Sequence, residues 1–460
     1  MIILRNLLRN NGAKERAKSR TRKLSIKEGS AYSISDGFGI KYITPYALAM
    51  NASNSQIGLL SSIPTLLGNI SQIYTTKLME KYPRNQILFI GAMLQAFMWL
   101  PVLGVGIFFF FFNSSNSFSI DLLILFYTML VAFGSFISPA WNSLMKDIVT
   151  RNSGKYFGTR NRVCGLVALV SMLLASFLLD YFKHTKVFFG FIALFSMAFI
   201  FRSLSAIMLK NYYEPRLKLE KEYYFTFLQF IKNIPKSNFG KFVVFVSLST
   251  LATQIASPFF AVYMLRELNF SYTFWISTVI SSILASLLFM PIWGKFTDKY
   301  GTVKTLKITG IFTPLVPFLW LLSPLLYKIN FYLLLAYIII VESFSGFIWA
   351  GFNLAAGNFI YDAVTRQRMA LCIAYFSVIN SIGFFIGASF GGIVSSMSSI
   401  PFGISPLIFV FFISGIARFL VYIFVSPTIK EVRTVKDLDI KNMHKDLLDF
   451  KPKKILNHLK

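Results

Sequence analysis

The segment Asp147-Ile-Val-Thr-Arg151 occurs again as Asp362-Ala-Val-Thr-Arg366, 215 residues later. Each copy follows a long apolar stretch. Two other landmarks return in the same order and at nearly the same offset: Glu80-Lys81-Tyr82 returns as Asp298-Lys299-Tyr300, and Arg202, which lies inside an apolar run, returns as Arg418. Three ordered matches at one offset indicate a chain built from two similar halves.

The composition indicates that lipid is the solvent of this chain. Hydrophobic residues make up 55% of it and charged residues only 14%, whereas soluble proteins average about 25% charged residues. A helix crosses the hydrocarbon core with about 20 mostly apolar residues, and helices are expected because unpaired backbone groups are too costly in lipid. Twelve such windows occur, at residues 31–50, 55–77, 87–111, 119–145, 158–182, 186–209, 241–265, 271–294, 305–328, 330–358, 369–396 and 404–427. The sequence therefore predicts an all-α membrane protein with twelve transmembrane helices in two pseudo-symmetric six-helix bundles.

The distribution of basic residues predicts the orientation. With the N-terminus in the cytoplasm, 39 of the 46 Lys and Arg residues fall in cytoplasmic segments, as the positive-inside rule requires. We therefore expect an integral protein of the cytoplasmic (plasma) membrane with both termini in the cytoplasm. The net charge of +27 is expected to contact anionic lipid headgroups rather than nucleic acid. The predicted domains are a basic tail (1–30), a first bundle (31–209), a linker with an interfacial helix (210–240), a second bundle (241–427) and a second basic tail (428–460).

The loop after the eighth predicted span carries a recognisable motif. Its sequence is Gly294-Lys-Phe-Thr-Asp298-Lys299-Tyr300-Gly301, which resembles the cytoplasmic signature G-x-x-x-D-[RK]-x-G of the major facilitator superfamily. The resemblance covers about residues 30–428 and implies two six-helix bundles that rock about a central site. The corresponding loop between spans two and three departs from the pattern, because Thr76, Glu80 and Pro83 replace the first Gly, the Asp and the second Gly.

The same resemblance implies that the charged residues of these loops brace the cytoplasmic ends of the helices. We expect Arg202 and Arg418 to have a scaffold role, and to bind Asp147 and Asp362 respectively. The expected gate or brace residues are Gly294, Asp298, Lys299, Gly301, Glu80, Lys81, Arg84, Asp147, Arg151, Asp362, Arg366, Arg202 and Arg418.

Charges inside the spans are costly in lipid, so each is a functional candidate. Glu342 lies near the middle of span ten, and the resemblance implies that spans one, four, seven and ten line the cavity. A carboxylate partly removed from water there could bind a proton or the substrate. The alternative is a permanent ion pair that joins two helices.

The first span holds Asp36 and Lys41, which lie five residues apart and so do not share a helix face as an i,i+4 pair would. Lys41 could pair with Glu342, bind an anionic substrate, or form an ion pair without a role in transport. Asp36 could contact the substrate or lie in the cytoplasmic vestibule. The other candidates on lining spans are Trp141, Asn142, Thr253, Gln254, Trp349 and Asn353.

We therefore expect a secondary active transporter that moves a small solute by alternating access, with protons as the coupling ion. We expect a monomer without cofactor or metal, since neither a Walker-type phosphate loop nor metal-ligand spacing occurs in the sequence. A non-transporting sensor or scaffold with the same fold is an alternative. A membrane-embedded enzyme is a further one, but the three histidines, His184, His444 and His458, lie outside the spans. The sequence leaves the charge of the solute open.

Overall fold

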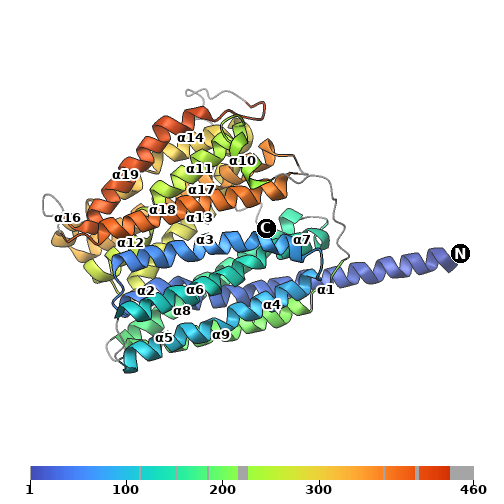
Figure 1. Cartoon of the computed structure of the whole chain (residues 1–460), viewed down its shortest axis with the longest axis horizontal. Helices are drawn as coiled ribbons and strands as arrows, with labels where there is room; N and C mark the ends of the chain where they lie inside the picture. The colour runs from blue at the N-terminus through green and yellow to red at the C-terminus, as the bar shows by residue number, and fades with distance from the viewer. Residues whose placement is uncertain are drawn as a thin grey trace. The chain divides into compact units, whose positions relative to one another are not determined.

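A computed structural model of the chain describes residues 2–112, 116–150, 153–183, 186–215, 226–365, 368–398 and 404–435. All regular secondary structure in these residues is helical (Figure 1). The first sequence half contains α1 (Ile2–Phe38), η1 (Ile40–Tyr42), α2 (Ile43–Ala49), α3 (Asn54–Leu78), α4 (Arg84–Phe97), α5 (Trp99–Phe112), α6 (Asn116–Phe136), α7 (Ser138–Ile148), α8 (Ser153–Lys183) and α9 (Val187–Lys210). This confirms the predicted all-α class.

The second sequence half continues with the same kind of elements. These are α10 (Phe227–Asn233), α11 (Asn238–Gln254), α12 (Ser257–Val262), η2 (Tyr263–Glu267), α13 (Tyr272–Tyr300), α14 (Thr302–Phe312), α15 (Leu315–Trp320), α16 (Ser323–Ile329), α17 (Phe331–Ala363), α18 (Met369–Ser395), α19 (Pro406–Val425) and η4 (Ser426–Thr428). The short helix α10 falls within the predicted linker, where Thr226 caps it through a hydrogen bond from the backbone N–H of Gln229.

Nine helical stretches of the described chain, some of them two or three of these elements in series, are long and apolar enough to cross a membrane. A tenth candidate is a pair bent by 41°, Thr302–Trp320 with Ser323–Ile329. The predicted spans at 31–50 and 55–77 are helical too, as α1 to α2 and as α3, but they are outside this apolar set. Both of them present polar side chains to a cavity described below.

Prolines divide several of the spans. Pro139, Pro258 and Pro324 each lie in the first turn of a new helix, α7, α12 and α16 respectively. Proline lacks the N–H that would continue the preceding helix, and its fixed φ suits a first turn. A predicted span is therefore often two or three short helices in series.

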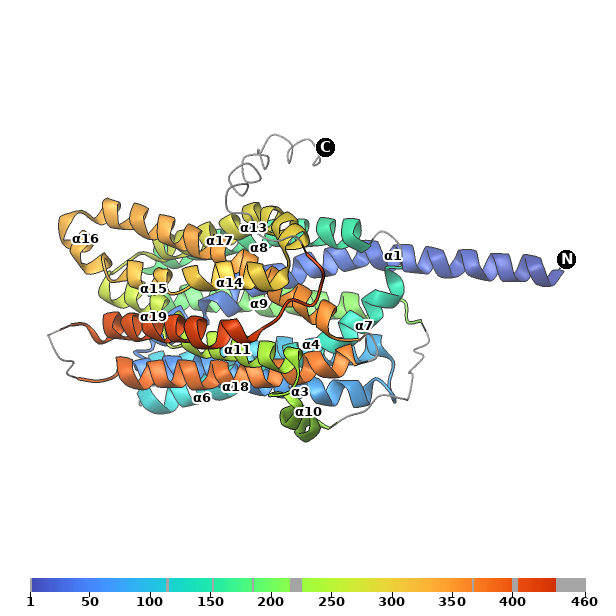
Figure 2. The same cartoon turned by 90° about the horizontal axis from the view of Figure 1, so that it is seen from above.

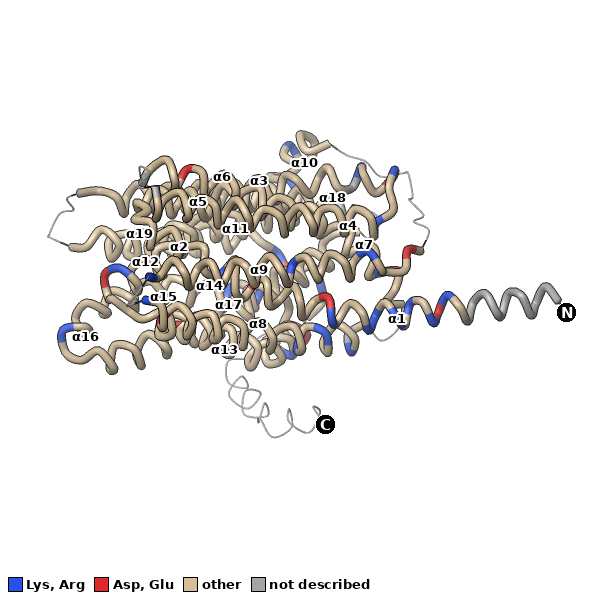
Figure 3. The backbone as a smooth tube through the Cα atoms, turned by 90° about the horizontal axis from the view of Figure 1, so that it is seen from below, with Lys and Arg blue, Asp and Glu red and all other residues tan. Residues whose placement is uncertain are grey.

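The helix α1 runs from Ile2 to Phe38 without a break, so the predicted basic tail and the start of the first span form one helix. Its later part packs against α8 and α9, and its N-terminal part extends beyond these neighbours (Figure 2). After Phe38 the first span turns through η1 and continues as α2. The charged residues lie mainly near helix ends, and long stretches of the spans carry none (Figure 3).

Contacts group the chain into two compact units. The first unit comprises residues 1–222, 253–277 and 374–410, and the second comprises 223–252, 278–373 and 411–460. The first unit therefore includes parts of α11, α12, α13 and α18 from the second sequence half. The division predicted from the repeat, at 31–209 and 241–427, stays a prediction.

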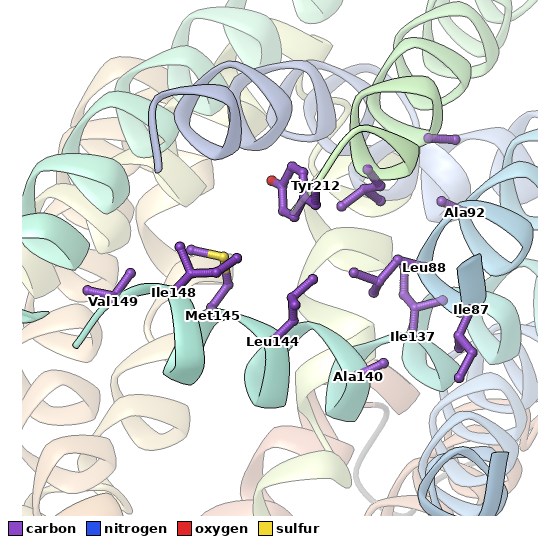
Figure 4. Packing of buried hydrophobic residues seen from close by; sticks show 12 residues of the cluster. Ile87, Leu88, Ala92, Ile137, Ala140, Leu144, Met145, Ile148, Val149 and Tyr212 are labelled. Carbon is purple, nitrogen blue, oxygen red and sulfur yellow. The ribbon is translucent and has the colours of Figure 1, made fainter. Parts of the chain in front are cut away.

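Within the first unit, one apolar cluster joins α4 and α7 beneath the end of α9 (Figure 4). Leu88, Leu144 and Ile148 are fully buried in it, and Tyr212 covers it from the segment after α9. Apolar surface that packing removes from water contributes about 25 cal/mol per Å² to stability. This cluster fixes the ends of the helices that carry the charged loop residues.

Candidate functional site

The first unit contains a cavity of about 490 Å³. It is lined by residues of α1 to α4, α6, α7 and α18: Tyr32, Ile40, Ile43, Thr44, Leu60, Ser61, Pro64, Thr65, Gln72, Gln95, Tyr127, Val131, Gly134, Ser135, Ser138 and Phe384. This volume is in the usual range for small-molecule sites, about 300–1,000 Å³. All the residues that line it belong to the first unit, so its shape follows from packing within that unit.

The helical period explains which side chains reach the cavity. On α6 and the start of α7, Tyr127, Val131, Gly134 and Ser138 are spaced by 4, 3 and 4 residues, which places them on one helix face. On α3, Ser61 and Thr65 are an i,i+4 pair in the same way. Two neighbouring helices thus each turn one face towards the cavity, and on α3 this face carries Ser61, Thr65 and Gln72, which add to the polarity of that helix.

Six hydroxyl groups of the lining are available to a ligand. The hydroxyls of Tyr32, Thr44, Ser61, Tyr127, Ser135 and Ser138 line the cavity without a hydrogen bond to another described residue, and they are not among the buried unsatisfied groups of the described chain. A hydroxyl can both donate and accept. The cavity therefore offers several hydrogen-bonding groups that only water or a ligand can satisfy.

Behind the cavity wall lies the repeated arginine of the first half. Arg202 is 2% exposed; its Nε donates to Gln95 Oε1 at 2.7 Å and its guanidinium carbon lies 4.8 Å from the centre of the Tyr32 ring. Both partners line the cavity. Because arginine only donates, the oxygen of the Gln95 amide must face Arg202, and the Gln95 Nε2 donor makes no hydrogen bond to another described residue.

The charge of Arg202 is balanced through a relay of buried polar groups. Its NH1 donates to Ser205 Oγ at 2.8 Å, and Ser205 Oγ donates to Glu28 Oε1 at 2.8 Å. Glu28 Oε2 also accepts from the Tyr212 hydroxyl at 3.1 Å and pairs with Arg160 at 3.5 Å. Burial, and secondarily the Glu28 carboxylate, raise the pKa of Tyr212, which keeps its hydroxyl a donor. This role of Glu28 was not predicted, because Glu28 falls in the segment predicted as a cytoplasmic tail (1–30).

The predicted candidates of the first span lie beside this cavity and are not part of its lining. Asp36 interacts electrostatically with Lys41 and with the two cavity tyrosines, Tyr32 and Tyr127. Lys41 lies in η1, where the span turns, and is exposed. The structure therefore brings Asp36 and Lys41 into mutual interaction, since the helix breaks between them.

In the second unit, Glu342 lies on α17 and interacts with Trp320 and Arg418. Arg418 is 4% exposed, and its NH1 donates to the Thr313 carbonyl at 3.0 Å. Pro317 has no N–H to donate to the carbonyl four residues earlier, which is that of Thr313. Arg418 thus satisfies a carbonyl that the proline leaves without its helical partner, while it also faces Glu342.

The other predicted lining residues occupy varied positions. Glu342, Trp349 and Asn353 share a face of α17 by their spacing; Trp349 packs on Phe352, with ring centres 5.3 Å apart, and Asn353 is exposed. In the first unit, the Trp141 ring stacks under the Arg160 guanidinium, 4.6 Å away, and Asn142 is exposed. Thr253 and Gln254 end α11 and are half-buried. Their roles in solute binding stay predictions.

On the predicted cytoplasmic side of the first half, Arg84 is the centre of a charge cluster. Its side chain is 1% exposed and pairs with Asp147 at 2.7 Å and Glu214 at 2.8 Å. It also donates to Ser143 Oγ and to the Pro215 carbonyl. Arg84 therefore ties the start of α4 to the end of α7 and to the segment after α9.

In the second half, the corresponding cluster is built around Glu431. Its carboxylate accepts from the Val303 N–H at 2.8 Å and the Thr302 hydroxyl at 2.9 Å, at the start of α14. Asp362 pairs with Arg433 at 2.9 Å. The predicted pairing of Arg202 with Asp147 and of Arg418 with Asp362 is therefore wrong: the two aspartates lie at helix ends, where Arg84 and Arg433 reach them, and the two arginines are held deeper in the spans.

The remaining motif residues can be placed one by one. Gly301 has φ +100°, and a Cβ there would lie 2.2 Å from Glu431 Oε2, so the second glycine of the motif is required by both backbone and space. Gly294 is half-buried, Lys299 lies 5.2 Å from the Tyr300 ring, and Asp298 is exposed and makes no hydrogen bond or ion pair with the described residues. Glu80 and Lys81 are exposed. Arg151 and Arg366 lie outside the described residues.

At the opposite ends of the helices, contacts within the first unit join the two sequence halves. Arg266 donates to the Ala52 carbonyl at 2.7 Å and to Asn54 Oδ1 at 3.0 Å. The Asn54 amide in turn donates to the Ser395 carbonyl at 2.8 Å. Asp180 at the end of α8 accepts two backbone N–H groups of the first turn of α13, each at 2.8 Å. A carboxylate at a helix N-terminus is a favourable arrangement.

Comparison with known proteins agrees with this architecture. The sequence model of the family described as Major Facilitator Superfamily matches residues 30–238 and 242–455 of this chain. A solved structure of a mutant nucleoside transporter NupG is similar, with a TM-score of 0.66 and 13% identity over 88% of this chain and 100% of that chain. The xylose transporter XylE from E. coli, in a partially occluded inward open conformation, is similar with a TM-score of 0.61 and 13% identity, over 91% of this chain and 100% of that chain. A bacterial homolog of the human lysosomal transporter Spinster has a TM-score of 0.60 and 13% identity, over 90% of this chain and 95% of that chain.

A search of curated proteins found no match. The helical fold, the charged loops and the polar cavity are those of a class of protein, the helical membrane transporters. The family match covers most of the chain, so this chain belongs to the major facilitator superfamily. It is therefore an integral membrane protein and a secondary transporter of a small molecule, and not an enzyme. The similarity to solved structures, at 13% identity, shows the fold alone.

Proposed function

We propose that the chain carries a small solute across the cytoplasmic membrane by alternating access, with the 490 Å³ cavity of the first unit as its solute site. The observation that carries this proposal is the set of six cavity hydroxyls that make no hydrogen bond to another described residue. A cavity formed only by packing defects would be apolar and dry, whereas a polar one of this size holds water or a ligand. With about 30 Å³ per water molecule, it has room for roughly sixteen waters.

We further propose that protons drive transport and that Glu342 binds the coupling proton. Glu342 is the acidic group that α17 carries at mid-length, and Arg418 and Trp320 interact with it. When Glu342 is ionised it attracts Arg418, and when it is protonated this attraction is lost. Proton binding would thus change the force between α17 and α19, a change that a conformational cycle can use.

The first experiment identifies a solute. Thermal denaturation of the purified protein is followed with a library of solutes, because a ligand that binds only the folded state raises Tm. Solutes that raise Tm are then tested for flux in proteoliposomes. Flux of at least one such solute above that of empty liposomes supports the proposal, and binding without any flux would favour a sensor or scaffold.

The second experiment tests the coupling. In Glu342→Gln, a carboxamide of the same shape cannot release a proton, so a pH gradient should no longer drive accumulation of the solute, while exchange of solute across the membrane continues. Ser343→Ala, next to Glu342 on α17, serves as the control. Its hydroxyl donates to the Ile339 carbonyl of the same helix at 2.7 Å, so this variant should keep the response to the pH gradient. Undiminished gradient-driven accumulation by Glu342→Gln would refute the role of this carboxylate.

A further inference from the structure

We propose that the cavity of the first unit selects an uncharged solute that carries several hydroxyl or carbonyl groups. This inference rests on the proposed function, since it assigns a substrate class to the proposed solute site. It narrows the three classes that the sequence leaves open, cations, anions and neutral molecules, to one.

None of the sixteen residues that line the cavity in the described part of the chain is Asp, Glu, Lys, Arg or His. An ion moved from water into such a site loses hydration without gaining an opposite charge in direct contact. The penalty for an unpaired ion in a protein interior is several kcal/mol. A neutral solute loses only hydrogen bonds to water, which the lining can replace.

The charged groups close to the cavity already have partners of opposite charge. Arg202 is covered by Gln95 and Tyr32, and Ser205 links it to Glu28. Asp36 interacts with Lys41. Arg160 also pairs with Glu28, so the groups near the cavity are three positive and two negative ones. Each of them has a partner or neighbour of opposite charge outside the cavity, and none of them lines the cavity itself.

The hydrogen-bonding groups match a solute with both donors and acceptors. The six lining hydroxyls can act in either sense. Gln95 adds a donor of fixed direction, because Arg202 occupies its oxygen. Its amide nitrogen lies so close to Gly134 that a Cβ there would approach it to 2.3 Å, so the amide has little freedom to turn. A carbonyl or hydroxyl oxygen of the solute is the partner that this donor fits.

The cavity also has apolar surfaces that suit the carbon skeleton of such a solute. The rings of Tyr32, Tyr127 and Phe384 belong to three different helices, α1, α6 and α18. Aliphatic side chains of η1, α2 and α3 complete the wall. The wall thus combines apolar surface with hydrogen-bonding groups, and small-molecule sites are built from these two components.

The charge preference can be measured without knowing the solute. In a background with Cys164→Ser and Cys372→Ala, single cysteines replace Ser61 or Ser135, and the rate of thiol modification is measured with three methanethiosulfonate reagents. The reagents carry a neutral hydroxyethyl, an anionic sulfonatoethyl or a cationic trimethylammonioethyl group. Each rate is divided by that of the same reagent with 2-mercaptoethanol, which removes intrinsic reactivity. Ser62→Cys is the matched control, because Ser62 is fully buried next to Ser61.

We expect the neutral reagent to react at Ser61→Cys and Ser135→Cys at least about tenfold faster, after normalisation, than either charged reagent, and Ser62→Cys to react with none. An ionic reagent that reacts as fast as the neutral one would overturn the assigned solute class and leave the proposed function intact. If no reagent reacts at either position, water does not reach the cavity, and the proposed function itself fails. Ser138→Cys provides a third position in case one of these variants does not fold.

Discussion

Glu214 accepts a hydrogen bond from the Asn85 N–H at the start of α4, and Glu431 accepts one from the Val303 N–H at the start of α14. Each glutamate follows the last span of its half, so the two are equivalent in the repeat. The basic partners differ. In the first half, buried Arg84 joins the loop itself to Asp147 and Glu214, whereas in the second half Arg433 reaches Asp362 from the segment after α19 and is 37% exposed.

The two halves of the repeat therefore share the same kinds of electrostatic contact, but the arginines that provide these contacts come from different positions in the sequence. A carboxylate at a helix N-terminus and an arginine on the repeated aspartate are present in both halves. The loop of the first half holds Arg84 at the position of Thr302, and Pro83 where the second half has Gly301. Since Arg84 is buried and Arg433 is not, the first cluster should contribute more to stability than the second.

The largest effect is expected for Arg84→Ala. It leaves Asp147 and Glu214 without their cation and the Pro215 carbonyl without a donor. Removing one partner of a buried ion pair costs about 3–5 kcal/mol, and we expect about 3 kcal/mol here because Asp147 and Glu214 keep part of their hydration. Thermal denaturation in detergent should show a clear fall in Tm.

The matched variant is Arg433→Ala in the second half. The Arg433 side chain is 37% exposed and makes one ion pair, whereas Arg84 is 1% exposed and makes two. A single pair whose cation is reached by water is worth about 1 kcal/mol or less, so the Tm of Arg433→Ala should fall much less than that of Arg84→Ala. Equal losses in the two variants would remove the distinction between the clusters.

The next largest effect is expected for Gly301→Ala. At φ +100° and ψ 163°, Gly301 has a conformation that is essentially restricted to glycine, and a Cβ would collide with the Glu431 carboxylate. A cost of about 1–3 kcal/mol is expected. Pro83→Ala is the control in the first half: the φ of Pro83 is −60°, so alanine should change Tm only slightly.

Smaller changes are expected for the two capping glutamates. Glu431→Gln keeps an acceptor at the start of α14 but loses the charge that faces the helix dipole, worth about 0.3–1 kcal/mol. Glu214→Gln loses in addition its ion pair with Arg84, so its effect should be the greater. Chemical denaturation that ranks the two in the opposite order would show that the helix cap, and not the ion pair, dominates.

The smallest effect is expected for Asp298→Asn. Its carboxylate is exposed and makes no hydrogen bond or ion pair with the described residues, and such surface changes usually stay within about 0.5 kcal/mol. The family resemblance implies a bracing role for this residue. A large fall in Tm would support that role in the state purified, whereas an unchanged Tm with altered transport would limit it to another state of the cycle.

Much of the fold could be predicted from the sequence. The apolar windows gave the class and the segments that form helices, because burial of the backbone in lipid leaves few alternatives to a helix. The breaks at Phe38 and before Pro139 were not predicted, since a window average does not detect where one span becomes two helices. The aspartates of the repeat were found, but their partners Arg84 and Arg433 depend on packing that the spacing of the repeat does not specify.

The cavity was harder to predict for a different reason. Charges within the spans indicated Glu342, Asp36 and Lys41 as candidates, whereas the polar groups that line the cavity are hydroxyls and amides. A single hydroxyl or amide costs little free energy in a membrane span, so it does not by itself indicate a functional site. A helical stripe was the available signal, as in Tyr127, Val131, Gly134 and Ser138 on one face. Glu28 was missed because its segment is basic overall, and only the packing of α1 against α9 buries it.

The most direct test of the account asks whether the solute passes through this cavity. In the cysteine-free background, Ser135→Cys is reconstituted into proteoliposomes, and flux of a solute identified by thermal shift is measured before and after complete modification with the neutral hydroxyethyl reagent. The account predicts that modification lowers the flux at least about tenfold, while the same treatment leaves flux through Ser62→Cys unchanged. Full modification at position 135 with undiminished flux would contradict it.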